Sequence, residues 1–148
     1  MNYRKANIND IYYLVHLRKE QLIEEGISTD ANVDKEFFDY FMANISDGTI
    51  IIWLATEASE IVATSGICFY QVPPSYSNLT GQVAYVTNVY TSPKYRKQGI
   101  ASHLLGLVIG EAKKLNYKLI RLITSPAGES IYKKAGFVKS EGHMVMTL

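Results

Sequence analysis

The sequence is poor in residues that could cross-link the chain or hold it in a membrane. Its single cysteine, Cys68, allows no internal disulfide and no multi-cysteine metal site. No stretch reaches the roughly 20 apolar residues that a membrane-spanning helix needs. The early basic residues Arg4 and Lys5 are not followed by an apolar run, so no secretory signal is evident. We therefore expect a cytoplasmic protein without a membrane partner.

The chain also lacks a large excess of charge. It has 15 lysine and arginine residues against 14 aspartate and glutamate residues, which leaves a net charge of +1. This balance gives little attraction for nucleic acid or for an anionic membrane, so the basic residues should act only locally. The three histidines, His16, His103 and His143, are far apart in the sequence and form no metal-binding pattern. We expect no nucleic-acid partner and no metal.

No linker, internal repeat or low-complexity tract interrupts the 148 residues, so we expect one domain spanning residues 1–148. Asn9 or Asp10 is the expected cap of the first helix, and Gly26 marks its end. The elements expected in the first half are strand 2–7, a helix with apolar residues from Ile11 to Ile23, a helix from Phe37 to Gly48, and the antiparallel strands 49–56 and 61–71. Loop 72–81 is either part of a substrate mouth or a rigid surface connection.

The second half predicts a parallel strand, helix and strand crossover, which should be right-handed. Its expected ranges are strand 84–90, helix 99–116 and strand 118–124. Ser125 and Pro126 are the expected start of one more helix, which Gly136 ends. Residues 137–139 and 143–147 are the last expected strands. The whole order predicts a mixed α/β fold.

Residues 89–101, VYTSPKYRKQGIA, join the first strand of this crossover to its helix. The first backbone N–H groups of a helix lack acceptors and carry partial positive charge, which suits a phosphate. Gly99 lets a ligand approach the backbone, and Lys94, Arg96 and Lys97 place positive charge nearby. The segment therefore indicates a polyanion-binding turn. It matches neither GxxxxGK[ST] nor GxGxxG, so nucleotide hydrolysis and nicotinamide binding lose their main support.

Two motifs together resemble those of the GNAT superfamily of acyl-CoA-dependent N-acyltransferases. Arg96, Gly99 and Ala101 fit its R/Q-x-x-G-x-G/A turn, and IYKKAGF, residues 131–137, is similar to its second signature. Both occur in the order and spacing of the family, and the resemblance in element order covers essentially the whole chain. It implies a central mixed, mostly antiparallel sheet with one parallel crossover and helices on both faces.

The resemblance also implies a donor, acetyl-CoA, and roles for particular residues, without a metal. Tyr132 would protonate the departing thiolate, since a phenol of pKa about 10 can donate to a thiolate of pKa about 8.5. A backbone N–H near Val89 would bind the thioester oxygen. The residues implied in coenzyme A binding are Val89, Tyr90 and Thr91 beside pantetheine, Arg96, Lys97, Gln98, Gly99, Ile100 and Ala101 around the diphosphate, and Ser125.

The sequence departs from the family pattern in two places. Many members carry a glutamate on the central strand as general base, but no carboxylate lies between Glu60 and Glu111 here. The base is therefore water, Glu129, a residue of the first two helices, or bulk solvent. Ser125 stands where many members have an asparagine that contacts pantetheine, so it either makes part of that contact or only caps the next helix.

These patterns lead us to expect transfer of an acetyl group from acetyl-CoA to a primary amine, of a small molecule in the first instance. Two alternatives stay open: a non-catalytic acyl-CoA-binding module, and an acetyltransferase acting on a protein N-terminus or lysine. The acids Glu24, Glu25 and Asp30 either attract a cationic amine or form a solvated helix end. The aromatic stripe Phe37, Phe38, Tyr40 and Phe41 is expected to be mostly core, with lining of the acceptor pocket by one of them as the alternative. A homodimer also stays open, because a buried stripe and an interface stripe look alike in sequence.

Overall fold

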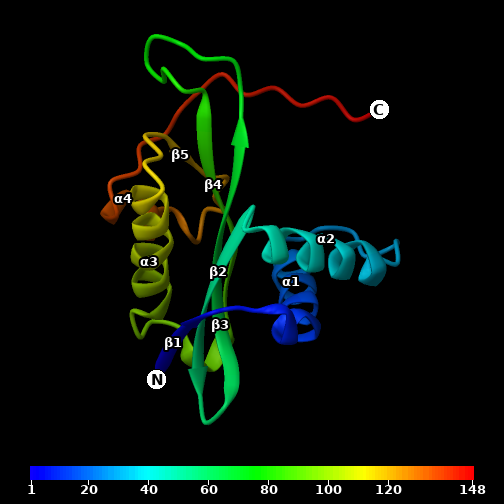
Figure 1. Ribbon diagram of the computed structural model, residues 1–148. Helices are drawn as coiled ribbons and strands as arrows, with labels where there is room; N and C mark the ends of the chain where they lie inside the picture. Colours follow the sequence, from blue (N-terminus) through cyan, green and yellow to red (C-terminus); the bar gives the residue numbers. More distant parts are fainter.

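A five-stranded sheet forms the centre of the computed structural model, which describes residues 1–148 (Figure 1). Its strand order is β1-β2-β3-β4-β5. The first four strands are antiparallel to their neighbours, whereas β5 runs parallel to β4. The expected mixed sheet with one parallel crossover is therefore confirmed. The strands are β1 (Asn2–Lys5), β2 (Ile50–Glu57), β3 (Glu60–Gln71), β4 (Gln82–Thr91) and β5 (Ile120–Arg121).

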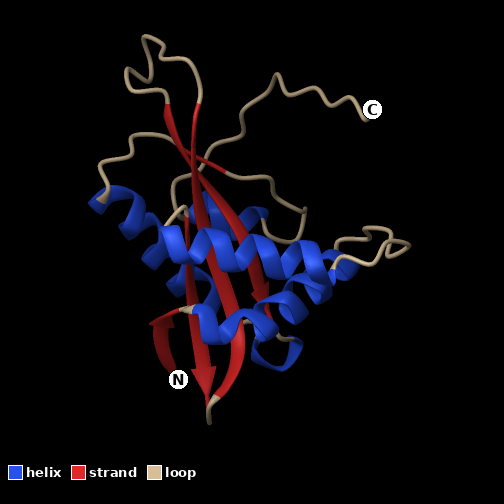
Figure 2. Ribbon diagram, turned by 45° about the vertical axis from the view of Figure 1, so that its right-hand side comes forward, coloured by secondary structure: helices blue, strands red, loops and turns tan.

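Helices cover both faces of the sheet, as expected. α1 and α2 lie together on one face and α3 lies on the other, and the view in Figure 2 shows the strands between them. None of the helices is long and apolar enough to cross a lipid bilayer. The helices are α1 (Ile11–Glu24), α2 (Asp34–Asp47), α3 (Ile100–Lys114) and α4 (Glu129–Lys134), with short 3-10 turns η1 (Ile8–Asp10) and η2 (Pro93–Tyr95).

The apolar run of β2 is explained by burial on both faces. Ile50, Ile52 and Leu54 pack in the core under α1 and α2. Ile51 and Trp53 point to the α3 side, where Trp53 donates a hydrogen bond to Glu111 of α3. Because both faces are covered, successive residues are apolar instead of alternating with polar ones.

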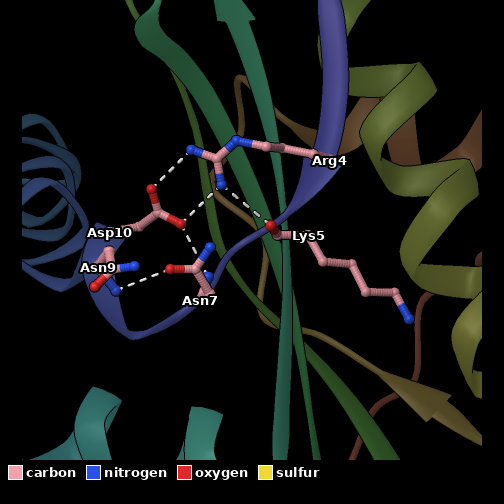
Figure 3. Close-up of polar contacts among 5 residues, drawn as sticks. All are labelled: Arg4, Lys5, Asn7, Asn9 and Asp10. Atoms are coloured by element: carbon pink, nitrogen blue, oxygen red, sulfur yellow. Dashed lines mark hydrogen bonds and ion pairs between the residues drawn. The ribbon is translucent and has the colours of Figure 1, made fainter.

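A network of polar contacts joins β1 to the first helical turn (Figure 3). Arg4 binds the Asp10 carboxylate through two hydrogen bonds of 2.8 and 2.7 Å, and Asp10 also accepts one from the backbone N–H of Asn7. The side chain of Asn7 accepts from the backbone N–H of Asn9, so Asn7 caps the turn η1. The sequence predicted that Asn9 or Asp10 caps α1, but neither side chain does so. The turn η1 intervenes and moves the cap to Asn7.

The start of α4 differs from the sequence prediction. The helix begins at Glu129, not at Ser125 or Pro126, and its N-terminus has no side-chain cap. The carbonyl of Ser125 accepts a hydrogen bond from the N–H of Gly128, which closes a separate turn before the helix. Capping of α4 by Ser125 is therefore wrong, because this turn separates Ser125 from the helix.

The C-terminal strands are also absent. Residues 137–139 and 143–147 pair with no strand, and the chain after α4 runs away from the sheet (Figure 1). The side chains of Met144, Val145 and Met146 are exposed. Of the expected strand 118–124, only Ile120 and Arg121 pair with β4. Apolar alternation favours a strand locally, but a strand forms only where a neighbour offers backbone partners.

We predict that Asp10→Ala lowers the free energy of unfolding by about 1–3 kcal/mol near neutral pH, because the variant loses charge-assisted hydrogen bonds at a buried carboxylate. The Arg4 guanidinium holds the pKa of Asp10 below its ordinary value, against the opposing effect of burial. Native Asp10 therefore takes up its proton at lower pH than the unfolded chain does. Its contribution is full above about pH 4 and is lost as the pH falls further.

Urea unfolding of wild type and variant between pH 2 and 7 measures this difference. The control is Asp39→Ala, which removes the exposed ion pair with Lys35 and should change stability by less than about 0.5 kcal/mol. Equal effects of the two substitutions at pH 7, or a difference that does not shrink in acid, would contradict the prediction.

Candidate active site

A β-bulge interrupts β4 near its carboxyl end. Thr64 of β3 is opposite Tyr90, but Gly66 is opposite Thr87, so β4 contains one extra residue between these pairs. Asn88, within the bulge, has a left-handed backbone with φ of 52°. As a result, Thr87 and Asn88 both line the cavity on the α1 and α2 side instead of alternating between faces. Val89 then packs on the α3 side.

The residues opposite the bulge are matched to it. The buried hydroxyl of Thr64 donates a 2.7 Å hydrogen bond to the carbonyl of Asn88. A Cβ on Gly66 would lie only 3.2 Å from the carbonyl oxygen of Thr87, so glycine allows the bulged backbone to approach β3. Between them, the hydroxyl of Ser65 is buried without a hydrogen-bond partner. Thr64 and Gly66 therefore hold the bulge, whereas Ser65 makes no polar contribution.

Beyond its short pairing with β5, one edge of β4 is free. The pairing with β5 is limited to Ala84 with Ile120 and Tyr85 with Arg121. From residue 86 to residue 91, β4 has no strand on that side, and this length includes Val89, Tyr90 and Thr91. Backbone groups on an unpaired edge can accept an extended ligand as an additional strand.

The turn after β4 leaves a helix N-terminus without internal partners. Lys97 and Gly99 have left-handed backbones, with φ of 61° and 80°, and α3 follows directly. The first hydrogen bond into the helix runs from His103 N–H to the Gly99 carbonyl, so the N–H groups of residues 97–102 have no acceptor in the chain. A Cβ built on Gly99 meets no atom within 4 Å, so space is open beside these groups. The turn thus provides anion-binding geometry.

Two of the three nearby cations are already paired. The Arg96 guanidinium donates to the carboxylate of Glu24 at 2.6 Å and to the Thr91 carbonyl at 2.8 Å. Its backbone N–H also donates to the Pro93 carbonyl, so Arg96 shapes the turn and ties it to the end of α1. Lys94 lies 3.5 Å from a carboxylate oxygen of Glu60.

The remaining side chains predicted at the donor site differ in what they contact. Lys97 is exposed and makes no ion pair, which leaves its ammonium available to a ligand. Gln98 donates a hydrogen bond from its side-chain amide to the Lys94 carbonyl. Ile100 is 4 % exposed and packs in the core beneath the turn, so only its backbone N–H can contribute. The side chains of this turn are therefore mostly structural, and its groups without a partner are backbone N–H groups.

Tyr132 lies on α4 and packs with Val89 against the same core cluster beside α3. Its ring meets Phe137 edge-on, and a Cβ on Gly128 would lie 3.0 Å from its ring carbon Cε2. Burial raises the pKa of Tyr132, and the nearby Glu25 and Tyr85 raise it further. The phenol therefore keeps its proton throughout the neutral range. Ser125 lies before the start of α4, and its side chain is exposed.

A cavity of about 400 Å³ adjoins the bulge on the opposite face from α3. Loop 72–81 contributes no residue to it. Phenol, thiol, amide, hydroxyl and phenyl groups form most of its wall, and one guanidinium enters from α1. The lining residues are Arg18, Phe37, Tyr40, Phe41, Cys68, Tyr85, Thr87 and Asn88. No sequence motif marks Arg18, because its neighbours here come from α2, β3 and β4.

No strong base faces the cavity. Burial raises the pKa of the Cys68 thiol and of the phenols of Tyr40 and Tyr85, so all three are neutral near pH 7. Glu129, one candidate from the sequence, is bound by Lys133 at 2.6 Å and Lys139 at 3.0 Å. These lysines hold the pKa of Glu129 below its ordinary value, which makes it a poor proton acceptor.

Comparison with known proteins places these features in context. Residues 11–137 match the model of the acetyltransferase (GNAT) family. A crystal structure described as a predicted acetyltransferase with acetyl-CoA, from Clostridium acetobutylicum, is 41 % identical in sequence. It superposes with a TM-score of 0.95, over 99 % of this chain and 95 % of that one.

More distant structures share the fold. A GCN5-related N-acetyltransferase from Ralstonia eutropha is 22 % identical with a TM-score of 0.91, over 99 % of this chain and 97 % of that one. Glucosamine-6-phosphate N-acetyltransferase from Arabidopsis thaliana is 18 % identical with a TM-score of 0.75, over the same shares of the two chains. No curated protein sequence matches the chain significantly.

We predict opposite outcomes for two adjacent substitutions under the bulge. Thr64→Val removes the only donor from a side chain to the Asn88 carbonyl and should cost about 1–3 kcal/mol of stability. Ser65→Ala removes a buried hydroxyl that has no partner, so its effect should be neutral or stabilising. Chemical unfolding measures both. A Ser65→Ala variant less stable than Thr64→Val would contradict this description of the bulge.

Proposed function

The chain belongs to the GNAT family of acetyltransferases, and from this membership we propose that it transfers an acetyl group from acetyl-CoA to the primary amine of a small molecule. The observation that carries the proposal is the position of the β4 bulge. It lies where the free edge of β4 meets the wall of the 400 Å³ cavity. A donor along that edge and an acceptor in the cavity would meet at Asn88 and Val89.

The chain fits the two ends of the donor. The free N–H groups of residues 97–102 would bind the diphosphate, with Lys97 as the nearby unpaired cation. The unpaired backbone of Val89, Tyr90 and Thr91 would hydrogen-bond the amides of pantetheine. Acetyl-CoA, when bound, supplies an acyl thioester. Ser125 would stand beside the pantetheine arm, since its side chain is exposed and caps no helix.

The cavity side supports direct attack by the amine in a ternary complex. A neutral amine nitrogen would form the new C–N bond while the C–S bond breaks, and the thiolate would leave with its electron pair. Tyr132 would hold a proton for that thiolate, because its raised pKa keeps the phenol protonated. Neither Cys68 nor any carboxylate lines the cavity as an ionised group, so the amine would lose its proton to water.

A bounded cavity favours a small acceptor over a protein chain. Its wall is formed by α1, α2 and the sheet, and about 400 Å³ accommodates a small metabolite-sized compound.

We predict that Ala101→Pro weakens coenzyme A binding without unfolding the protein. Ala101 lies in the first turn of α3, where proline is tolerated, and its N–H has no acceptor in the chain. Losing one charge-assisted hydrogen bond to the diphosphate costs about 1.5–3 kcal/mol, or roughly 10- to 100-fold in affinity. Calorimetric titration with coenzyme A measures it. Ala101→Ser keeps the N–H and is the control. Equal affinities of the two variants would remove this N–H from the donor site.

We predict that Tyr132→Phe lowers kcat by about 100-fold or more, with the affinity for acetyl-CoA largely kept, because the phenol acts on the leaving thiolate. Thiol release over a panel of amines measures the rates. Since the pKa of Tyr132 is raised, its phenol should stay protonated in mildly alkaline solution. The wild-type rate should therefore begin to fall only when the pH exceeds about 10.

The matched control is Tyr76→Phe, which removes a fully exposed phenol in loop 72–81, outside the cavity wall, and should leave kcat unchanged. Unaltered turnover in Tyr132→Phe across this pH range would reject the acid assignment. Bound acetyl-CoA that stays intact with every amine would instead favour a non-catalytic acyl-CoA-binding module.

A further inference from the structure

Arg18 is a cation at the acceptor cavity without an anionic partner. It lies on α1, is half-buried, and lines the cavity opposite the β4 residues Tyr85 and Asn88. Its one side-chain hydrogen bond is to the amide oxygen of Gln21, at 3.1 Å, and it forms no ion pair. By contrast, the guanidinium groups of Arg4 and Arg96 each bind a carboxylate.

The other groups that line the cavity carry no charge near neutral pH. None of its lining residues is a carboxylate, and burial keeps the phenols and the thiol neutral. The positive charge of Arg18 partly offsets the raised pKa of both Tyr40 and Tyr85, which line the same cavity. The cavity therefore has a single charged group, and it is positive.

The nearby acids lie outside the cavity wall. Glu24 pairs with Arg96, and Asp30 accepts a hydrogen bond from the hydroxyl of Ser28. Glu25, which accepts from the side-chain amide of Gln21 at the exposed end of α1, raises the pKa of Tyr85, and Asp47 raises that of Tyr40, but neither carboxylate lines the cavity. A cationic acceptor thus finds no carboxylate in the cavity, although the sequence left that interpretation open.

We propose that the acceptor amine carries an anionic group, a carboxylate or a phosphate, which Arg18 binds in this cavity. The inference rests on the proposed function for the identity of the site. A guanidinium presents parallel N–H donors that fit either oxyanion, and only one of its groups is used by Gln21. The phenyl groups of Phe37 and Phe41 would contact an apolar body between the amine and the anion.

Matched pairs of amines test the proposal. Phenylalanine is compared with phenethylamine, 4-aminobutyrate with butylamine, and phosphoethanolamine with ethanolamine, each with saturating acetyl-CoA. We expect at least one member with the anionic group to exceed its counterpart without it at least 10-fold in kcat/KM. The carboxylate and phosphate pairs show which anion is preferred. Amines without an anionic group that are turned over as well as every counterpart that has one would overturn the proposal.

The variant Arg18→Met keeps the length and apolar stem of the side chain while removing its charge. We expect the preference for the amine with the anionic group to fall at least 10-fold, mainly through a higher KM, while turnover of the amine without that group is kept. The control is Lys19→Met, which removes a neighbouring positive charge that pairs with Asp34 outside the cavity. An anion preference equal in Arg18→Met, Lys19→Met and wild type would also overturn the proposal.

A binding measurement separates failure of this inference from failure of the proposed function. N-acetylphenylalanine and its uncharged amide are titrated against the complex with coenzyme A, in wild type and Arg18→Met. Preferential binding of the carboxylate that depends on Arg18, without turnover of any amine, would support the anion site and reject catalysis. Turnover of amines together with equal binding of both ligands would support catalysis and reject the anion site.

Discussion

The hydrogen bond from the Thr64 hydroxyl to the Asn88 carbonyl satisfies a buried backbone group where the ladder between β3 and β4 is interrupted. Without a partner, that carbonyl would carry the full cost of lost solvation. Gly66 leaves room for the displaced backbone next to it. The bulge so stabilised puts two successive residues on the cavity side and sends Val89 to the other face. The free edge of β4 and the cavity therefore meet at one point of one strand.

The proposed donor half of the site depends on backbone conformation more than on charge. The left-handed Lys97 and Gly99 bring the chain into α3 with its first N–H groups unoccupied. Arg96, the arginine of the family motif, is engaged by Glu24 and by the Thr91 carbonyl. Its contacts link the end of β4, the turn and α1, so the same residue that identifies the motif also positions the turn relative to the acceptor side.

The proposed acceptor half depends on which charges are paired elsewhere. Arg4 pairs with Asp10, Arg96 with Glu24 and Glu129 with two lysines, and each pairing removes a charge from the reaction chemistry. Arg18 forms no ion pair and lines the cavity together with neutral phenols. A buried or half-buried charge in a low-dielectric wall acts more strongly on a ligand than an exposed one, so this one residue gives the cavity its electrostatic character.

By itself, the sequence determined the family, the element order as far as α4, and the turn before α3 for which we propose polyanion binding. Those features depend on residues close together in the chain, such as Pro93, Gly99 and the apolar face of α3, whose effects are local. Tertiary structure decided the rest. The cavity takes Arg18, Tyr40, Cys68 and Tyr85 from four elements, and the bulge changes the facing of β4 in a way that period-two alternation cannot reveal. The last expected strands, 137–139 and 143–147, have the local pattern but no neighbouring strand, and backbone pairing requires a partner that only the folded chain can supply.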